Sequence, residues 1–454
     1  MSFPGRSKQR ISILGMGYVG LVTAATFLKL GHRVICVDVL KERVNLVNNG
    51  RSPIFEIGLE EAINEGINSG NLMATTDTTV AARCSDVIFI CVGTPSCSDG
   101  SIDLRFVRKA AKDVGKALKG HKGFPVIVVK STVIPSTCDK VVRPILEKVS
   151  GLKAGRSFGL ACNPEFLKEG MALNDSLRPD RIVIGGIDNR SCDAVLKLYN
   201  GIKAPVIFTD LTTAEMIKYA SNAFLATRVG LSNEVANICS AHGVDVYEVM
   251  NGVGLDKRIG PHFLRAGAGF GGSCFPKDLK ALKAAAMKAK VPHNILHAVL
   301  EHNEVQPLET VNLLKKVVKD LRGRKIALMG LSFKPDTDDV RETRAYPIAL
   351  ALVKEGATVL LYDTNKAALA GFMRLPGIST KTKRFVRCDS IKEALEECDG
   401  AIIQTESKEF KALQPKDIKK WMRRPVIIDG RRTFDPEVMA HSGIIYRGIG
   451  WKNL

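Results

Sequence analysis

The sequence predicts an α/β fold in which two doubly wound parallel-sheet domains are joined by a central helical domain with one long helix. Three observations predict it: short apolar runs alternate with helical patterns near both ends of the chain, those two ends partly repeat each other, and the middle is helical throughout. Parallel strands are buried on both faces and therefore read as continuous apolar runs. A chain of 454 residues accommodates about three domains, and we expect them at residues 1–210, 211–321 and 322–454.

The first domain opens with a glycine-rich turn, GMGYVG, between an apolar strand and a helical pattern. In Rossmann-like folds the three glycines of GxGxxG make the turn, let the backbone approach a pyrophosphate and pack the helix on the strand. The N–H groups of the helix N-terminus then face the phosphates. The turn residues that we expect to contact a dinucleotide are Gly15, Gly17, Tyr18, Val19 and Gly20.

The residues at the ends of later strands refine this prediction. Asp38 ends the next strand, VICVD, and its carboxylate suits a ribose hydroxyl and repels a 2′-phosphate. We therefore expect NAD as the cofactor and poor use of NADP, a preference that nearby Arg43 weakens slightly. Ligands of open parallel sheets bind at the carboxyl ends of the strands, where Thr94, Thr132 and Glu165 stand in this sequence.

The start of the chain also raises the question of export. Residues 11–28 carry no charge and follow a basic segment, which superficially resembles a signal peptide or a membrane span. The strand, turn and helix pattern within them argues against both. The eleven cysteines are scattered without a CxxC pair, as expected for free thiols in a reducing compartment. We expect a cytoplasmic protein with no membrane partner.

Composition bounds the partners further. The formal net charge is +19, which favours anionic partners such as nucleotide-like metabolites or nucleic acid. The basic residues are spread through amphipathic segments, and none of the common recognition motifs is present, so we expect no nucleic-acid partner. His293 and His297 lie four residues apart, but neither HExxH nor a companion ligand accompanies them, and we expect no metal.

The C-terminal part partly repeats the N-terminal part. KIALMGLSFK from Lys325 echoes ISILGMGYVG, VLLYDTN echoes VICVDVL, and PVIIDGR echoes PVIVVKS. GLSFKPDTDDVRETR replaces GxGxxG, so this domain is expected to hold a different phosphorylated ligand. Between the two, residues 211–243 contain no proline, with Thr212 or Thr213 as the expected N-cap. A helix of that length is expected to span two domains or a subunit interface.

One stretch, GAGFGGSCFPKD at residues 267–278, surrounds Cys274 with four glycines. Each glycine inside a helix or strand costs roughly 0.5–1 kcal/mol relative to alanine, so the stretch predicts a loop held for close approach. A cysteine that serves only as a small core residue needs neither these glycines nor the following Lys277 and Asp278. An ordinary thiol is only a few per cent thiolate at neutral pH, so neighbouring donors are expected to activate it.

Taken in order, GMGYVG, CVGTP, STVIPST, NPEFLKEG, PDRIVIGG, EMIKYASNAFLA, GAGFGGSCFPKD, GLSFKPDTDDVRE and DGRR resemble the motifs of the UDP-glucose/GDP-mannose dehydrogenase family. The match covers essentially the whole chain. It implies NAD-dependent oxidation of a nucleotide sugar's C6 alcohol to a carboxylate, through a thiohemiacetal and a thioester on Cys274. PDRIVIGG looks more like the UDP-glucose branch than the GDP-mannose or UDP-N-acetylhexosamine branches, which remain alternatives.

The resemblance also implies roles. Lys218 and Asn222 stabilise the alkoxide and later oxyanions, Asp278 manages a water or proton with Lys218, and Glu165 is the base for thioester hydrolysis. The implied catalytic residues are Cys274, Lys218, Asn222, Asp278, Glu165 and Thr132. Besides the turn residues, the implied cofactor contacts are Asp38, Arg43, Thr94, Thr132, Glu169 and Arg341. The implied substrate contacts are Glu165, Phe166, Leu167, Lys218, Asn222, Arg258 from a neighbouring subunit, Phe263, Gly271, Lys334 and Arg432.

The family resemblance predicts UDP-glucose as the substrate, a homodimer formed through the central helix and an active site between the outer domains. Two rivals stay open. A two-electron dehydrogenase of a hydroxy acid or sugar phosphate explains the dinucleotide fold but not the Cys274 loop, and predicts one NADH per substrate. A non-catalytic nucleotide-binding or nucleic-acid-binding protein explains the charge, and predicts salt-sensitive binding that survives the loss of Cys274.

Overall fold

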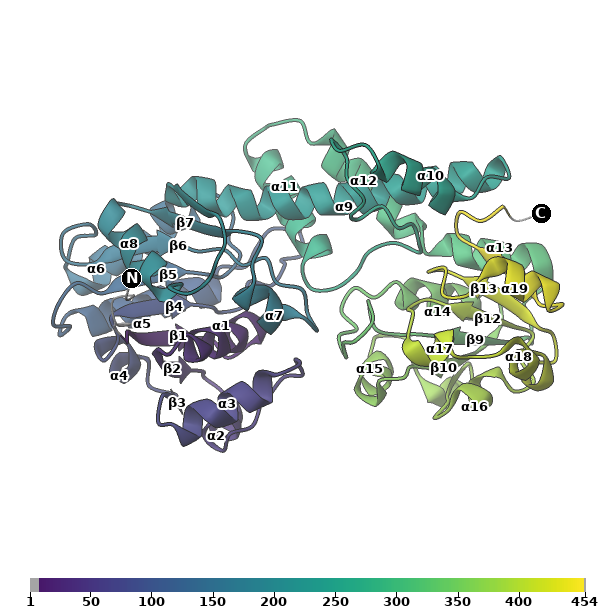
Figure 1. Ribbon diagram of the computed structural model, residues 1–454, viewed down its shortest axis with the longest axis horizontal. Coiled ribbons are helices and arrows are strands. Elements are labelled where there is room, and N and C mark those ends of the chain that lie inside the picture. Colours follow the sequence, from purple (N-terminus) through teal and green to yellow (C-terminus); the bar gives the residue numbers. More distant parts are fainter. Residues whose placement is uncertain (1–7, 453–454) are drawn as a thin grey trace, which may run out of the picture. The chain divides into compact units, whose positions relative to one another are not determined.

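A computed structural model describes residues 8–452 of the chain, and residues 1–7, which hold most of the basic segment at the start, lie outside it together with residues 453 and 454. The chain divides into two compact units, Met1–Ser221 and Asn222–Leu454. Each unit is built on one sheet with helices on both of its faces (Figure 1). The predicted fold class is therefore confirmed, while the three predicted domain boundaries stay a prediction.

The first unit contains an eight-stranded sheet in the order β3-β2-β1-β4-β5-β6-β7-β8. Its strands are β1 Arg10–Leu14, β2 Arg33–Val37, β3 Leu72–Thr75, β4 Val87–Ile90, β5 Val126–Val129, β6 Gly159–Cys162, β7 Ile182–Gly186 and β8 Val206–Thr209. Its helices are α1 Tyr18–Lys29, α2 Lys41–Asn48, α3 Leu59–Asn68, α4 Thr78–Arg83, α5 Arg105–Leu118, the π-helix η1 Cys138–Val142, α6 Arg143–Ser150, α7 Ala172–Leu177 and α8 Asn189–Leu198. Along β4, Phe89 packs into the core on one face, whereas Ile88 and Ile90 pack into the core on the other.

One junction of this sheet differs from the parallel arrangement that the apolar runs suggested. β6 and β7 pair antiparallel, with Cys162 opposite Gly185, while the other strand pairs are parallel. An antiparallel neighbour needs no crossover helix. The chain between β6 and β7 holds only the short helix α7 and so returns at the same edge of the sheet. The motif NPEFLKEG lies in this connection and therefore stays at the carboxyl end of β6.

The second unit contains a six-stranded parallel sheet in the order β11-β10-β9-β12-β13-β14. Its strands are β9 Lys325–Met329, β10 Thr358–Tyr362, β11 Phe385–Arg387, β12 Gly400–Ile403, β13 Val426–Asp429 and β14 Ile445–Gly448. The helices that accompany them are α14 Ala345–Lys354, α15 Lys366–Phe372, the 3₁₀ turn η2 Thr380–Thr382, α16 Ile391–Leu395, α17 Lys408–Lys411, α18 Pro415–Trp421 and α19 Pro436–His441.

The structure confirms the internal repeat in its hydrogen bonding. After β1, the N–H of Met16 donates to the Asp38 carboxylate at 2.9 Å. After β9, the N–H of Leu331 donates to the Asp363 carboxylate at 2.6 Å. In both units an aspartate after the second strand thus holds the backbone just after the first strand.

Helices α9 Leu211–Ala241, α10 Val246–Gly254, α11 Phe275–Lys288, α12 Asn294–Val305 and α13 Leu308–Val318 form the predicted helical middle. α9 runs without a break for 31 residues. Asp210 caps it, because its carboxylate accepts hydrogen bonds from the N–H and hydroxyl of Thr213 at 2.9 and 2.5 Å. The expected cap, Thr212 or Thr213, was therefore misplaced. Within residues 8–452, none of the helices has the length and apolar character needed to cross a membrane.

Candidate active site

The turn between β1 and α1 is shaped for a phosphate group. Gly15 has φ +103°, and a Cβ on Gly20 would lie 1.8 Å from the carbonyl oxygen of Gly15, so neither position accepts a side chain. A Cβ on Gly17 would meet no atom within 4 Å, so the space in front of it is open. As N-cap of α1, Gly17 contributes no side-chain bond to the first-turn N–H groups. The turn therefore fits a pyrophosphate held on backbone N–H groups.

Asp38 lies beside this turn, nearly buried. Besides Met16, the N–H of Leu40 donates to its carboxylate at 3.0 Å, and the Arg43 guanidinium lies 3.6 Å away. These contacts orient the carboxylate, and the predicted cofactor residues Asp38 and Arg43 therefore lie together. The Tyr18 hydroxyl accepts a hydrogen bond from the N–H of Gly170 at 2.8 Å and donates one to the Glu56 carboxylate.

Two further predicted cofactor residues are joined at the ends of β4 and β5. The hydroxyl of Thr94 donates to the carbonyl of Thr132 at 2.9 Å. Glu169 lies in the connection after β6, and Arg341 lies in the second unit, where it pairs with Asp339 at 2.6 Å. The set of predicted cofactor contacts is therefore divided between the two units.

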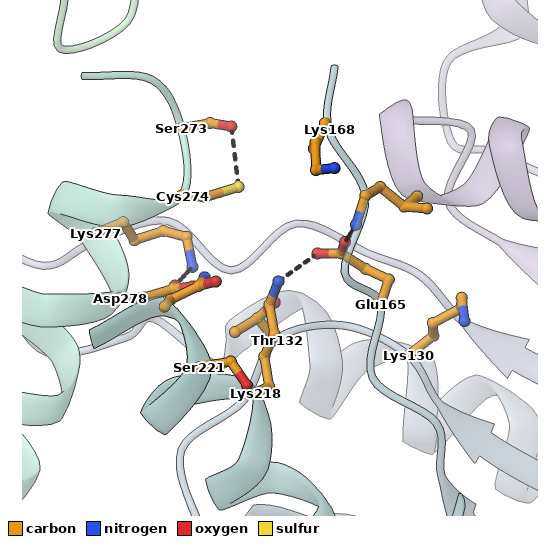
Figure 2. Close-up of polar contacts among 12 residues, drawn as sticks. Lys130, Thr132, Glu165, Lys168, Lys218, Ser221, Ser273, Cys274, Lys277 and Asp278 are labelled. Carbon is orange, nitrogen blue, oxygen red and sulfur yellow. Dashed lines mark hydrogen bonds and ion pairs between the residues drawn. The ribbon is translucent and has the colours of Figure 1, made fainter. Parts of the chain in front are cut away.

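A buried ion pair joins the connection after β6 to helix α9. The Lys218 ammonium lies 3.1 Å from the Glu165 carboxylate, whose side chain is only 6% exposed (Figure 2). The other oxygen of Glu165 accepts the N–H of Leu167 at 2.7 Å, and the Phe166 ring lies 5.5 Å from the Lys218 ammonium. The predicted residues Glu165, Phe166, Leu167 and Lys218 thus form one cluster within the first unit.

The electrostatics of this pair favour an ionised carboxylate. Burial alone would raise the pKa of Glu165, but the Lys218 ammonium, the Leu167 N–H and the charge of Lys130 outweigh it, and the pKa lies below its ordinary value. Glu165 therefore carries the charge that a general base needs at neutral pH.

Sequence reasoning missed Lys130, which lies at the end of β5. Its buried ammonium donates to the side chain of Asn163 at 2.9 Å and to the Tyr199 hydroxyl at 3.4 Å. Lys130, Asn163, Glu165, Asp180 and Arg181 line a cavity of about 100 Å³. The signal was visible as the lysine that ends the apolar run PVIVV, because a charge in that place is costly unless it is paired.

Sequence reasoning also missed Glu215, one turn before Lys218 on α9. Its buried carboxylate accepts the N–H of Ser136 at 2.6 Å and the N–H of Cys138 at 2.7 Å. Burial raises its pKa to about 7. Glu215 thus fastens the STVIPST segment, which contains Thr132, to the helix that carries Lys218.

In the second unit, the thiol and its predicted neighbours lie at the start of α11. Cys274 is the half-buried N-cap residue, and its sulfur lies 3.6 Å from the Ser273 hydroxyl (Figure 2). The buried Asp278 carboxylate accepts a hydrogen bond from Asn222 at 2.6 Å and pairs with the Lys277 ammonium at 2.5 Å. Helix N-termini favour negative charge, so this position suits a thiolate.

The other cysteines contrast with Cys274. All eleven lie within the described residues, and none of them forms a disulfide. Burial raises the pKa of Cys36, Cys91, Cys388 and Cys398 to about 12, so those thiols remain protonated.

Helix α9 presents Lys218 and Asn222 one turn apart and hence on the same side of the helix.

A second cavity, of about 280 Å³, lies between the thiol loop and the sheet of the second unit. Its lining includes the predicted substrate residues Phe263, Gly271 and Lys334, together with Phe270, Phe333 and Arg431. The lining holds three basic side chains, Arg265, Lys334 and Arg431, beside the carboxylate of Glu406. The cations and the aromatic rings suit a nucleotide with its phosphates.

Arg432, predicted to hold the nucleotide, makes other contacts. Its guanidinium pairs with both oxygens of Asp245 at 3.0 and 2.8 Å and lies between the rings of Tyr247 and Trp451. Its neighbour Arg431 lines the cavity and donates to the carbonyl of Gly269 at 2.8 Å. The motif DGRR contains two adjacent arginines. Which of them faces the cavity depends on the direction of the backbone after β13, and the sequence does not specify that direction.

The remaining predictions concern surface positions. The Arg258 side chain is 89% exposed and pairs with Asp256, an exposure that leaves it available to another molecule. His297 lies 3.2 Å from Glu301 and 3.0 Å from Lys283. Among residues 8–452, no group of three or more His, Cys, Asp or Glu side chains is arranged to hold a metal ion.

Comparison with known proteins accounts for most of the chain. Residues 9–203 match the NAD binding domain, residues 212–305 the central domain and residues 327–436 the UDP binding domain of the UDP-glucose/GDP-mannose dehydrogenase family. A UDP-glucose 6-dehydrogenase of Bacillus subtilis is 41% identical over 97% of this chain and 93% of its own. A GDP-mannose 6-dehydrogenase of Pseudomonas putida is 44% identical over 78% of this chain and 81% of its own. The structure of a UDP-glucose dehydrogenase from Pyrobaculum islandicum superposes with a TM-score of 0.91 at 39% identity, covering 99% of this chain and 100% of that one.

Proposed function

The chain belongs to the UDP-glucose/GDP-mannose dehydrogenase family, and we propose that it catalyses the NAD-dependent, four-electron oxidation of UDP-glucose to UDP-glucuronate. The observation that carries this proposal is the half-buried Cys274 at the start of α11, one turn before an Asp278 carboxylate bonded to Asn222. UDP-glucose is favoured over GDP-mannose because the UDP-glucose 6-dehydrogenase relative aligns over 97% of this chain, whereas the GDP-mannose relative aligns over 78%.

The first unit supplies a cofactor site that fits NAD. The open turn at Gly17 would hold the pyrophosphate, and the Asp38 carboxylate would accept hydrogen bonds from the adenosine ribose. When bound there, NAD supplies the hydride acceptor, one NAD molecule for each of the two oxidations of the sugar's C6 carbon. Thr94 and Thr132, joined by a hydrogen bond, would fix the polar edge of the site.

In the first oxidation the C6 hydroxyl loses a proton and its carbon loses a hydride, giving an aldehyde. We assign stabilisation of the alkoxide to the Lys218 ammonium and the Asn222 amide, because a cation and an amide donor suit developing negative charge. Asp278, which binds the Asn222 side chain, would take up the proton together with a water.

In the second oxidation the Cys274 sulfur forms a bond to the aldehyde carbon, which gives a thiohemiacetal. Loss of the second hydride and of the hydroxyl proton leaves a thioester. Glu165, kept ionised by its pair with Lys218, would take a proton from water as that water adds to the thioester carbon. The C–S bond then breaks, which releases the carboxylate and restores the thiol.

The nucleotide would occupy the cavity of the second unit. Lys334 and Arg431 provide positive charge for the diphosphate, and Phe263, Phe270 and Phe333 provide apolar surface for the base and ribose. Arg431 is added to this role because it lines the cavity, and the predicted contact of Arg432, which is paired with Asp245, stays a prediction.

A homodimer through α9 is part of the proposal. Phe224, Leu231 and Ile238 are spaced seven residues apart and are 75%, 60% and 53% exposed. Apolar residues at that spacing form a seam along one side of a helix and favour pairing. The exposed Arg258 would then reach the sugar bound by the partner subunit. The free cysteines support a cytoplasmic location.

The variant Cys274→Ala tests the covalent mechanism. We expect NAD affinity to stay within a few fold of wild type, because the cofactor contacts proposed for the first unit are untouched, and we expect formation of UDP-glucuronate to be abolished. The measurement is chromatography of the reaction products. Cys97→Ala, which removes an exposed thiol, is the matched control and should behave as wild type. A Cys274→Ala enzyme that still forms the carboxylate would refute the mechanism.

A further inference from the structure

The loop that leads to Cys274 is buried although it has no regular secondary structure. Residues 266–272 are all buried and lie between helices α10 and α11. A buried N–H or C=O group that finds no partner costs about 1–3 kcal/mol, and such groups are nearly always paired. The partners of this backbone therefore show what holds the loop in place.

Three buried side-chain amides supply the partners of Gly267 and Phe270, while Arg431 and backbone groups pair with other positions of the loop. Asn233 on α9 accepts the N–H of Gly267 at 2.8 Å, and Gln306, just after α12, donates to the carbonyl of Gly267 at 2.9 Å. Asn303 on α12 accepts the N–H of Phe270 at 2.7 Å and donates to the carbonyl of Phe270 at 3.0 Å. Asn303 thus satisfies both backbone groups of one residue, as a neighbouring strand would.

The glycine beside this pairing is adapted to it. Gly269 has φ +100°, and a Cβ at that position would lie 2.7 Å from the side-chain oxygen of Asn303. The Arg344 guanidinium, in turn, donates to the backbone carbonyl of Asn303 at 3.3 Å. Arg344 therefore holds the backbone of Asn303, while the side chain of Asn303 holds the loop.

The contact continues from the loop to the thiol. The ring of Phe270 packs edge-on against the ring of Phe275, with centroids 6.0 Å apart. Phe275 directly follows Cys274 and opens helix α11. Asn303, Phe270 and Phe275 thus form a continuous line of contacts that ends at the residue next to the sulfur.

We propose that Asn303 is a positioning residue that fixes the Cys274 thiol for attack on the aldehyde, an inference that rests on the covalent mechanism proposed above. The first oxidation does not use the thiol and should tolerate the loss of Asn303. The second oxidation needs the sulfur within bonding reach of the aldehyde carbon, and a displacement of about 1 Å can slow such a step about 100-fold. The aldehyde then escapes before it is trapped.

The test compares Asn303→Ala with wild type in three measurements: NADH formed per UDP-glucose consumed, aldehyde trapped by hydroxylamine, and the rate at which iodoacetamide alkylates Cys274. We expect the NADH ratio to fall from two towards one, trapped aldehyde to rise, and the alkylation rate to change several-fold. Asn312→Ala, which removes an exposed asparagine on α13, should match wild type in all three.

An effect of the variant on the stability of the fold must be distinguished from an effect on the position of the Cys274 thiol. Leu395→Ala removes buried volume from a hydrophobic cluster of the same unit that is made up of residues outside the loop, and it should lower the denaturation midpoint while leaving the NADH ratio at two. If Asn303→Ala does not fold, Asn303→Asp decides by the same measurements, because it keeps the acceptor for the Phe270 N–H and loses the donor to the Phe270 carbonyl. A folded Asn303 variant with a ratio of two and wild-type alkylation would overturn the proposal. Carboxylate formation by Cys274→Ala would instead overturn the mechanism beneath it.

Discussion

At the scale of single residues, the chemistry depends on charges that are buried together. Glu165 and Lys218 are both nearly inaccessible and lie 3.1 Å apart. A buried carboxylate without a partner would take up a proton near neutral pH. The pKa of Glu165 is instead lowered, because the charges of Lys218 and Lys130 and the Leu167 N–H overcome burial. Lys130, whose ammonium is hydrogen-bonded to Asn163 and Tyr199, therefore acts on the proposed base through its charge.

Lys130→Met tests that dependence. Methionine keeps much of the side chain's length and removes the charge, so the pKa of Glu165 should rise. The carboxylate would then become protonated at a higher pH, and activity would be lost earlier as the pH falls. The measurement is the pH dependence of UDP-glucuronate formation, in which the acidic limb should move to higher pH. Lys122→Met, at an exposed lysine, should leave that limb in place, and an unmoved limb in Lys130→Met would remove Lys130 from this role.

Residues of this kind were only partly predictable. Asp38 and the turn glycines follow from a local pattern that fixes strand, turn and helix within about 25 residues. Lys130 and Arg431 depend on how a strand end or a turn is oriented in the folded chain. Arg431 and Arg432 are adjacent in the sequence, yet one lines the cavity and the other pairs with Asp245.

At the scale of elements, α9 fastens other segments as well as carrying Lys218 and Asn222. Glu215 accepts two backbone N–H groups from the segment that follows Thr132. The length and continuity of this helix were predictable from a long periodic pattern without proline. Its cap at Asp210 was not, because neighbouring threonines and aspartates are all good caps. The antiparallel placement of β7 was also hidden, since apolar runs do not reveal strand direction.

The variant Glu215→Gln tests whether Glu215 holds the STVIPST segment against helix α9. The amide nitrogen of glutamine would face either the Ser136 or the Cys138 N–H, leaving one donor unpaired at a cost of about 1–3 kcal/mol. We expect the urea-denaturation midpoint to fall and the turnover rate to fall with it, because Thr132 lies in the loosened segment. Glu234→Gln, at an exposed glutamate of the same helix, serves as the control. An unchanged midpoint in Glu215→Gln would show that these bonds do not hold the segment.

At the scale of the whole molecule, the sequence repeat correctly indicated two related sheets. The same aspartate-to-backbone bond recurs after β1 and β9, although only the first unit keeps GxGxxG. The oligomeric state has to be argued from the surface, because a single chain shows an exposed apolar seam but not the molecule that would cover it. The exposed line of Phe224, Leu231 and Ile238 supports the proposed dimer.

Leu231→Asp tests the proposed assembly. An aspartate in the middle of the seam would be buried against a second copy without a counter-charge, which is strongly unfavourable. Light scattering coupled to size-exclusion chromatography should therefore give a dimer mass for wild type and a monomer mass for the variant. Glu234→Gln should remain dimeric. A Leu231→Asp protein with the wild-type mass would place the interface elsewhere.

The most direct test of the proposed chemistry is the number of NADH molecules formed per UDP-glucose, run to completion with limiting UDP-glucose and excess NAD. We predict a ratio of two, because one protein would carry out both oxidations and Cys274 would retain the aldehyde between them. A ratio of one would contradict the covalent second oxidation and favour a two-electron dehydrogenase. No NADH at all would exclude UDP-glucose as the substrate.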